Sequence, residues 1–149
     1  MSTDQPVART LKYRVLRIFL WCGNRMLRWT LRRGIGPNAF ALLETTGRKT
    51  GQRRQTPVGN GLRSDTFWLI AAHGTQADFI RNISHDPHVR VMVNRRWRSG
   101  VAVLMPEDDT RERSRTLPYH WDAAIGRTIA TTPITVRIDL DSPGHGPTI

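Results

Sequence analysis

Short apolar segments separated by turn residues fill the chain from position 39 to 140, and they limit the fold more strongly than any other feature of the sequence. The segment 88–94 alternates strictly and places Val89, Val91 and Val93 on one face of an expected strand. Hairpin turns, rather than crossover helices, connect most neighbouring segments. The pattern predicts a mainly β (α+β) fold, a closed or nearly closed antiparallel barrel with helices packed outside it. The expected strands, about six in number, are 39–46, 55–60, 66–72, 88–94, 97–105 and 134–140.

Helical periodicity marks three further segments. The first is 10–33, which carries an apolar side and an arginine-rich side, and a cluster of glycine and proline at 34–37 ends it. A short helix is expected at 78–85. A third helix is expected to begin at the acidic stretch 106–109, because negative charge suits the positive end of a helix, and to continue, either unbroken or with a break, to about position 130. The apolar side of the first helix is expected to consist of Leu11, Val15, Ile18, Phe19, Cys22, Met26 and Trp29.

The length of 149 residues fits one domain. We expect a basic amphipathic helix and linker over 1–38, the barrel domain over 39–140 and a flexible tail over 141–149. The longest early apolar run is too short for a signal peptide or a membrane span, so a cytoplasmic protein is expected. The one cysteine, Cys22, excludes an internal disulfide framework.

The chain is strongly basic, with 23 Lys and Arg residues against 12 Asp and Glu residues and a formal net charge of +11. Such an excess favours an anionic partner, such as nucleic acid, an acidic membrane surface, or a phosphorylated or polycarboxylate ligand. No nucleic-acid-binding module is recognisable, so we expect no nucleic-acid partner. We also expect no metal site, because Pro87 breaks helical geometry between His85 and His88 and no cysteine or carboxylate cluster supports them.

The most informative motif is the basic turn 47–54, GRKTGQRR, which follows the first expected strand. Gly47 and Gly51 permit tight bends and a close approach of the backbone to a ligand. Backbone N–H groups in such a turn can form an anion-binding concavity, and the Arg and Lys side chains add positive charge. The motif is not a GxxxxGK[ST] loop. The residues alone leave two interpretations open: an anion site for phosphate or carboxylate, and a solvated hairpin turn with incidental charge.

The string TTGRKTGQ.R..P, which begins at Thr45, resembles the phosphate-tail motif of the deazaflavin (F420)-dependent nitroreductase and quinone reductase family. The segment 81–89, RNISHDPHV, is similar to the family's NL..NP.V segment, which leads from a helix into a strand. The resemblance covers about 39 to 140 and implies a split β-barrel of the flavin and deazaflavin oxidoreductase superfamily. It also implies hydride transfer from reduced coenzyme F420, with FMN the less favoured cofactor.

The resemblance also implies roles for individual residues. It places the anionic tail of the coenzyme on the basic turn, the ring system beside Pro57, and a second binding loop after the strand 66–72. Cofactor binding is therefore expected at Arg48, Lys49, Thr50, Gln52, Arg54, Pro57, Ala71, Ala72, His73, Gly74 and Phe79.

Two residues are candidates for catalysis. His73 is expected to place a proton or to bond to the ring, because histidine titrates near neutral pH. Tyr119 is expected to donate a proton to the acceptor after hydride transfer. The alternatives are a loop histidine without a chemical role and a helix start that packs Tyr119 on the barrel.

The chain departs from the nitroreductase branch of the family in two places. The loop 73–78 is shorter, and a tyrosine is missing near Gly59 and Asn60. Reduction of nitro compounds is therefore not carried over. We expect an oxidoreductase that passes a hydride to an apolar conjugated acceptor, such as a quinone or an unsaturated lipid-like molecule. The alternative is a non-enzymatic protein that binds a fatty acid or another apolar ligand on the same barrel.

The first helix and the oligomeric state complete the expectations. The arginine-rich side of the helix is expected to meet an anionic bilayer, which would place the protein peripherally on the inner face of the cell membrane. The alternative is a helix packed on the barrel with its basic side in solvent. Split barrels of this kind are often dimers, so a homodimer is also expected.

Overall fold

Seven strands form one antiparallel sheet in the order β2-β1-β5-β6-β7-β4-β3. The computed structural model describes residues 25–33, 38, 40–117 and 132–142. The strands are β1 (Phe40–Thr46), β2 (Arg53–Gly59), β3 (Leu62–Arg63), β4 (Thr66–Ala71), β5 (His88–Val93), β6 (Arg96–Met105) and β7 (Ile134–Leu140). The helices are the 3₁₀ helix η1 (Gly74–Gln76), α2 (Asp78–His85) and α3 (Thr110–Thr116), and residues 25–32 are also helical.

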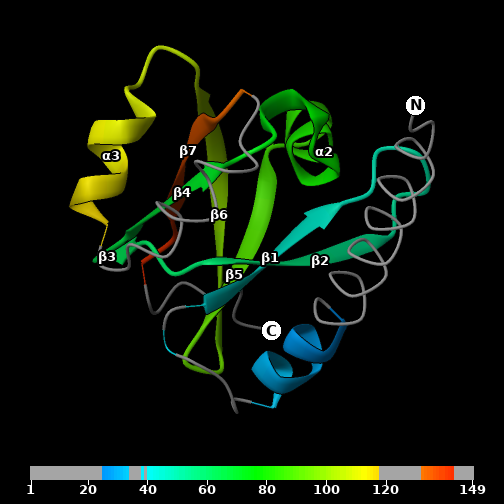
Figure 1. Ribbon diagram of the computed structural model, residues 1–149. Helices are drawn as coiled ribbons and strands as arrows, with labels where there is room; N and C mark the ends of the chain where they lie inside the picture. The colour runs from blue at the N-terminus through cyan, green and yellow to red at the C-terminus, as the bar shows by residue number, and fades with distance from the viewer. Residues whose placement is uncertain (1–24, 34–37, 39, 118–131, 143–149) are drawn as a thin grey trace, which may run out of the picture.

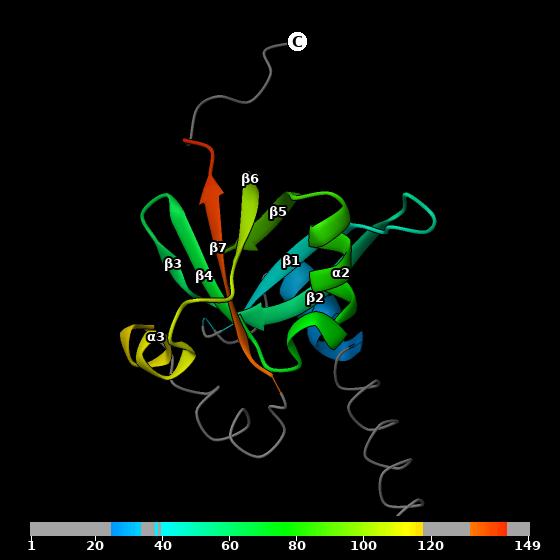
Figure 2. The ribbon, with the colours of Figure 1, turned by 90° about the horizontal axis from the view of Figure 1, so that it is seen from above.

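The sheet curls on itself, as Figures 1 and 2 show. β2 forms one edge but also contacts β4, which lies next to the opposite edge. The expected mainly β fold with an antiparallel split barrel is therefore confirmed. Pro57 lies in the edge strand β2, where a residue without an N–H group is tolerated. The short strand β3 was not expected, because Leu62 and Arg63 are too few to show an alternating pattern.

The main core fills the inside of the curled sheet. Phe67, Val136 and Ile138 are fully buried there, and Val89 and Val91 of β5 join them as the alternation predicted. α2 packs against β1 and contributes Ile80 and Ile83, which are 0% and 3% exposed. Each such side chain stabilises the fold by roughly 1.5–3 kcal/mol. This packing fixes α2 on the barrel and therefore also fixes the positions of its other side chains.

A smaller apolar cluster lies on the outer face of β1 and β5. The helical segment 25–32 buries Leu31 there against Leu42 and Met92. The expected apolar side of the first helix is wrong in this part of the chain, because Met26 and Trp29 are 69% and 52% exposed. The segment carries apolar residues on two sides, and the sheet selects the side with Leu27 and Leu31. The expected helix over 10–24 lies outside the described residues.

The helix expected from position 106 begins later, and in the described residues α3 ends at Thr116. Asp109 is its N-cap, and its side chain accepts hydrogen bonds from the N–H groups of Arg111 and Glu112. The residue after α3, Leu117, has an extended backbone and is buried, so the helix ends at Thr116. The rest of the expected helix, 118–130, lies outside the described residues. The division into 1–38, 39–140 and 141–149 stays a prediction.

Candidate functional site

The basic turn connects β1 to β2 and is closed by its own backbone. The N–H of Gly47 donates to Gln52 O at 2.7 Å, and the N–H of Gly51 donates to Gly47 O at 2.8 Å. Gly51 has φ +69°, which favours glycine. A side chain at Gly47 would meet Gln52 O at 3.0 Å. The two glycines that the sequence singled out therefore set the shape of the turn.

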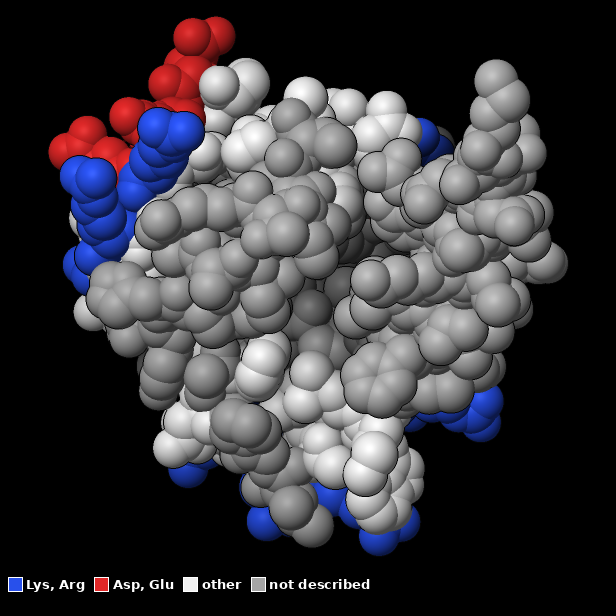
Figure 3. Space-filling model, viewed as in Figure 1, with Lys and Arg blue, Asp and Glu red and all other residues white. Residues whose placement is uncertain are grey.

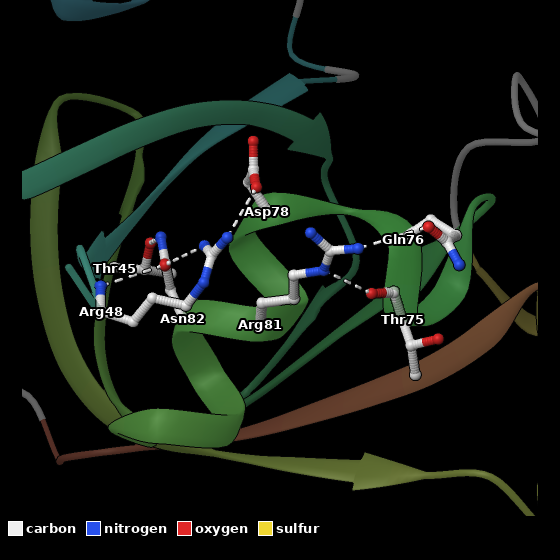
Figure 4. A network of polar contacts seen from close by, with 7 residues as sticks. All are labelled: Thr45, Arg48, Thr75, Gln76, Asp78, Arg81 and Asn82. Carbon is white, nitrogen blue, oxygen red and sulfur yellow. Dashed lines mark hydrogen bonds and ion pairs between the residues drawn. The ribbon is translucent and has the colours of Figure 1, made fainter.

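A buried asparagine of α2 holds this turn on the helix. Asn82, 3% exposed, accepts from the backbone N–H of Arg48 at 3.2 Å and from the Arg48 guanidinium Nη1 at 3.0 Å. Its own Nδ2 donates to Thr45 Oγ1 at 3.2 Å. Figure 4 shows Asn82 between Thr45 and Arg48. One side chain of α2 thus contacts the end of β1, the backbone of the turn and the first cation of the turn.

The other end of the Arg48 guanidinium contacts a carboxylate. Nη2 lies 3.2 Å from Asp78 Oδ1 at the start of α2 (Figure 4). The Arg48 side chain is 25% exposed and the Asp78 side chain is 83% exposed. Arg48 is therefore positioned by one buried and one exposed partner, and its charge is partly balanced within the chain.

The same helix contacts the loop after β4. Arg81 donates from Nε to Thr75 O at 3.1 Å and from Nη2 to Gln76 Oε1 at 3.3 Å (Figure 4). Gly74, at the start of η1, has φ +51°, and a Cβ there would lie 2.1 Å from Thr132 O. α2 therefore contacts the basic turn and also residues 75–76, which directly follow the loop 71–74 that the sequence assigned to the same cofactor.

The remaining cations of the turn fall into two classes. Lys49 and Arg54 are exposed, and among the described residues they make no hydrogen bond or ion pair. Arg53 instead donates from Nη1 to Glu44 Oε1 at 2.8 Å. Lys49 and Arg54 are thus the cations of this turn with no partner in the described part of the chain.

Glu44 forms a charged network on the outer face of β1. It is 6% exposed and also accepts from Gln55 Nε2 at 2.9 Å, with Arg90 Nε 3.2 Å from Oε1. Burial raises the pKa of Glu44, but the hydrogen bonds from Gln55 and Arg53 and the charge of Arg90 outweigh it, so that the pKa is lowered. Glu44 therefore stays ionised at neutral pH and keeps Arg53 on the sheet.

The other predicted cofactor residues are placed as follows. Thr50 and Gln52 belong to the turn, where Thr50 Oγ1 accepts from the N–H of Gln52. His73 is exposed at the start of η1. Ala71 is 3% exposed and belongs to the main core, so its side chain is not available to contact a ligand. Pro57, Ala72 and Phe79 are partly buried, and Phe79 packs against the core. Tyr119 lies outside the described residues.

Residue-by-residue analysis of the sequence missed Asn82, Asp78 and Arg81, which join the site together. The available signal was positional: Asn82 and Arg81 stand in the segment that resembles the family's NL..NP.V motif. Asp78 carries no such signal.

A groove of about 700 Å³ opens beside the same turn, and the sequence did not indicate it. β1, β2, β5 and β6 line it with charged and polar side chains, among them Glu44, Arg53, Arg90 and Ser99. Arg48, Lys49 and Arg54 are not among its lining residues. The described residues contain no group of three or more His, Cys, Asp or Glu side chains arranged to hold a metal ion.

Comparison with known proteins identifies the family. The model of the F420H(2)-dependent quinone reductases matches residues 27–141. The chain belongs to this family. It is therefore an oxidoreductase, and the resemblance expected from the sequence is confirmed. The match favours the enzyme over the non-enzymatic lipid-binding alternative. It carries the quinone reductase description, and nothing in it supports nitro reduction.

Solved structures share the fold at low identity. An F420-H2 dependent reductase, FDR-A, is 22% identical with a TM-score of 0.53, over 69% of this chain and 94% of that one. A domain-swapped dimer is 18% identical with a TM-score of 0.54, over 78% and 95%. The heme storage protein HutZ from Vibrio cholerae is 12% identical with a TM-score of 0.53, over 78% and 92%. Such likenesses show a common fold alone, and curated proteins give no match.

Proposed function

We propose that this chain transfers a hydride from reduced coenzyme F420 to an apolar conjugated acceptor, such as a quinone or an unsaturated lipid-like molecule. The family supports the coenzyme and the reaction type. The observation that carries the proposal in this chain is the basic turn, which is anchored on α2 and leaves Lys49 and Arg54 without partners in the described residues. When bound, the reduced deazaflavin supplies the hydride, and the protein contributes position and electrostatics.

The residues of the turn fit an anionic tail of phosphate and glutamates. Lys49 and Arg54 are already exposed, so an anion that binds them breaks no internal contact. Arg48 is fixed by Asn82, and its side chain is 25% exposed. Four backbone amides of the turn, those of Gly47, Arg48, Gly51 and Gln52, are already bonded, so we assign the charge of the tail chiefly to side chains.

His73 and Tyr119 remain the proposed catalytic residues. The exposure of His73 at the start of η1, on the loop that Arg81 holds, supports its access to a bound ligand. Its proposed role is to place a proton or a hydrogen bond at the ring system. Tyr119 is proposed to donate the proton that completes reduction of the acceptor. His73→Ala and Tyr119→Phe should lower the rate of coenzyme oxidation while leaving coenzyme binding in place.

The first experiment is a fluorescence titration of the purified protein with oxidised coenzyme F420 at low salt. We expect saturable binding that is weakened roughly tenfold in a Lys49→Ala, Arg54→Ala variant, because two exposed charge contacts are lost. Arg115→Ala, which removes an exposed cation from the last turn of α3, is the matched control and should bind like the parent. Absence of binding by the parent, together with no coenzyme oxidation in the presence of a panel of quinones, would refute the proposed function.

Membrane contact and a homodimer are proposed as additional properties. In the described part of the first helix, Arg28 and Arg32 donate to Gln55 of β2. Met26 and Trp29 are exposed, as are Arg32 and Arg33, and Arg33 stacks on the Trp29 ring at 4.4 Å. An apolar side with a flanking cation suits the surface of an anionic bilayer. Co-sedimentation with anionic vesicles should therefore decrease in Trp29→Ala, and light scattering tests the dimer. No helix among the described residues has the length and apolar character needed to cross a membrane.

A further inference from the structure

The guanidinium of Arg48 has two protein partners of different character. On one side it donates to Asn82 Oδ1, and Asn82 is buried and bonded also to Thr45. On the other side it meets Asp78, whose side chain is 83% exposed. Asn82 is buried and is also held by the N–H of Arg48 and by Thr45, so it cannot turn away from the guanidinium, whereas breaking the second contact returns an exposed carboxylate to water. The first partner is therefore fixed, and the second can be exchanged.

The exchangeable partner is an anion at the place where the proposed function requires one. Lys49 follows Arg48 in the chain, and the backbone of the turn is held by Asn82 whether or not Asp78 is engaged. A carboxylate or phosphate of a ligand can replace the Asp78 carboxylate on Nη2 without any movement of the turn. Both anions cannot use the same N–H group at full strength, so they compete for it.

Resting on the proposed function, we propose that Asp78 is a resident counter-ion that the anionic tail of the coenzyme displaces from Arg48, and that this competition sets the affinity for the tail. Asp78 then competes for Arg48 with every anion that approaches the turn. A ligand with several negative charges, such as a phosphate followed by glutamates, displaces it, because Lys49 and Arg54 bind the further charges. A ligand with a single negative charge gains less from the same exchange. Asp78 is thus a specificity-determining residue that selects for a multiply charged tail.

The test compares Asp78→Asn with the parent in titrations with oxidised coenzyme F420. Removal of the competing carboxylate should tighten binding about threefold to fivefold. The deazaflavin core without phosphate and glutamates is the second probe, and its affinity should be the same in both proteins. Asp78→Ser serves as a second substitution that also removes the carboxylate, and circular dichroism checks that both variants are folded.

The matched control is Glu112→Gln. Glu112 is an exposed carboxylate in the first turn of α3, as Asp78 is in the first turn of α2, and the change removes the same unit of charge. α3 lies away from α2 (Figures 1 and 2). On the face of the molecule shown in Figure 3, the visible acidic side chains gather on the side where α3 lies. Glu112→Gln should therefore leave the affinity for the coenzyme unchanged.

The outcomes separate the two levels of the proposal. Failure of the parent to bind the coenzyme contradicts the proposed function. Binding by the parent with unchanged or weaker binding by folded Asp78→Asn and Asp78→Ser overturns the counter-ion role and leaves the proposed function standing. Equal tightening by Glu112→Gln, or tightening toward the tail-free core, also overturns it, because the effect would then come from net charge or from the ring site.

Discussion

Replacement of Asn82 by alanine should destabilise the protein and weaken coenzyme binding together. The change removes the two hydrogen bonds that Arg48 donates to Asn82 Oδ1 and the one that Asn82 Nδ2 donates to Thr45 Oγ1. Thr45 is 2% exposed, so its hydroxyl would lose its partner in a buried place. At about 1 kcal/mol for each bond, the three together predict a loss of about 3 kcal/mol in the free energy of unfolding. Urea denaturation followed by circular dichroism measures it.

Replacement by aspartate separates the two effects. A carboxylate at position 82 keeps both acceptor contacts with Arg48, and the Thr45 hydroxyl can rotate to donate to it. We therefore expect Asn82→Asp to cost less than about 1 kcal/mol of stability near neutral pH. It nevertheless puts a second negative charge beside Arg48, so the affinity for the anionic coenzyme should fall while that for the tail-free core is kept. This pattern distinguishes a residue that positions the turn from one that only supports the fold.

The control for both variants is Ser84→Ala in the same helix. The Ser84 hydroxyl donates to Ile80 O within α2 and is exposed, so its removal should change stability by less than about 0.5 kcal/mol. The reasoning is refuted if Asn82→Ala unfolds within about 0.5 kcal/mol of the parent. In that case the three bonds would contribute nothing net, and the turn would be held by its own backbone.

Two further predictions concern the loop glycines and the buried carboxylate. Gly74→Ala should lower the free energy of unfolding, measured by urea denaturation, by about 3 kcal/mol or more, because the new Cβ would lie 2.1 Å from Thr132 O at φ +51°. Gly51→Ala, at φ +69° with no atom within 4 Å, should lower it by only about 1 kcal/mol. Equal losses in the two variants would contradict the steric argument. Burial raises the pKa of Glu44, but Gln55 and the arginines lower it below its ordinary value of 4.5, so its contribution to stability is complete above that pH and is lost as the pH falls through the lowered pKa. Glu44→Gln should thus reduce stability at pH 7 and flatten the acid limb of the stability curve, and an unchanged slope would disprove the role of Glu44.

The strands could be predicted from the sequence because their burial alternates. In β5, Val89 and Val91 are buried and Arg90 between them is partly exposed, which is the pattern that the letters show. The turn at Asn94 and Arg95 also adopts positive φ at both residues, as a two-residue hairpin turn requires. These features depend on neighbours in the chain and are therefore visible in one sequence.

The first helix shows where this reasoning fails. Met26 and Trp29 have the spacing of a buried side, and so do Leu27 and Leu31. The choice between them depends on the sheet, which offers Leu42 and Met92 on its outer face and places Gln55 where Arg28 and Arg32 can donate to it. None of these partners is local, so periodicity alone could not decide.

From the sequence the candidate site could be proposed as a segment but not as individual cations, and its role in cofactor binding stays a prediction. The letters GRKTGQRR show a basic turn, but they do not show which charges are available to a ligand. Arg48 is engaged by residues more than 25 positions away, and Arg53 is held by Glu44 on the neighbouring strand. Only contacts across the fold leave Lys49 and Arg54 as the cations without a partner in the described residues.

α2 makes the turn and the loop after β4 one unit. Ile80 and Ile83 pack into the core, the buried Asn82 contacts the turn, and the exposed Arg81 contacts the loop. A change in the position of the helix would therefore displace the basic turn 47–54 and the loop of His73 together. Since the core fixes the helix through Ile80 and Ile83, which are 0% and 3% exposed, the spacing between the turn and the loop is set by packing and not by the two segments themselves. The short loop 73–78 is itself held in place, by hydrogen bonds from Arg81 at one point and by the close approach of Gly74 to Thr132 at another.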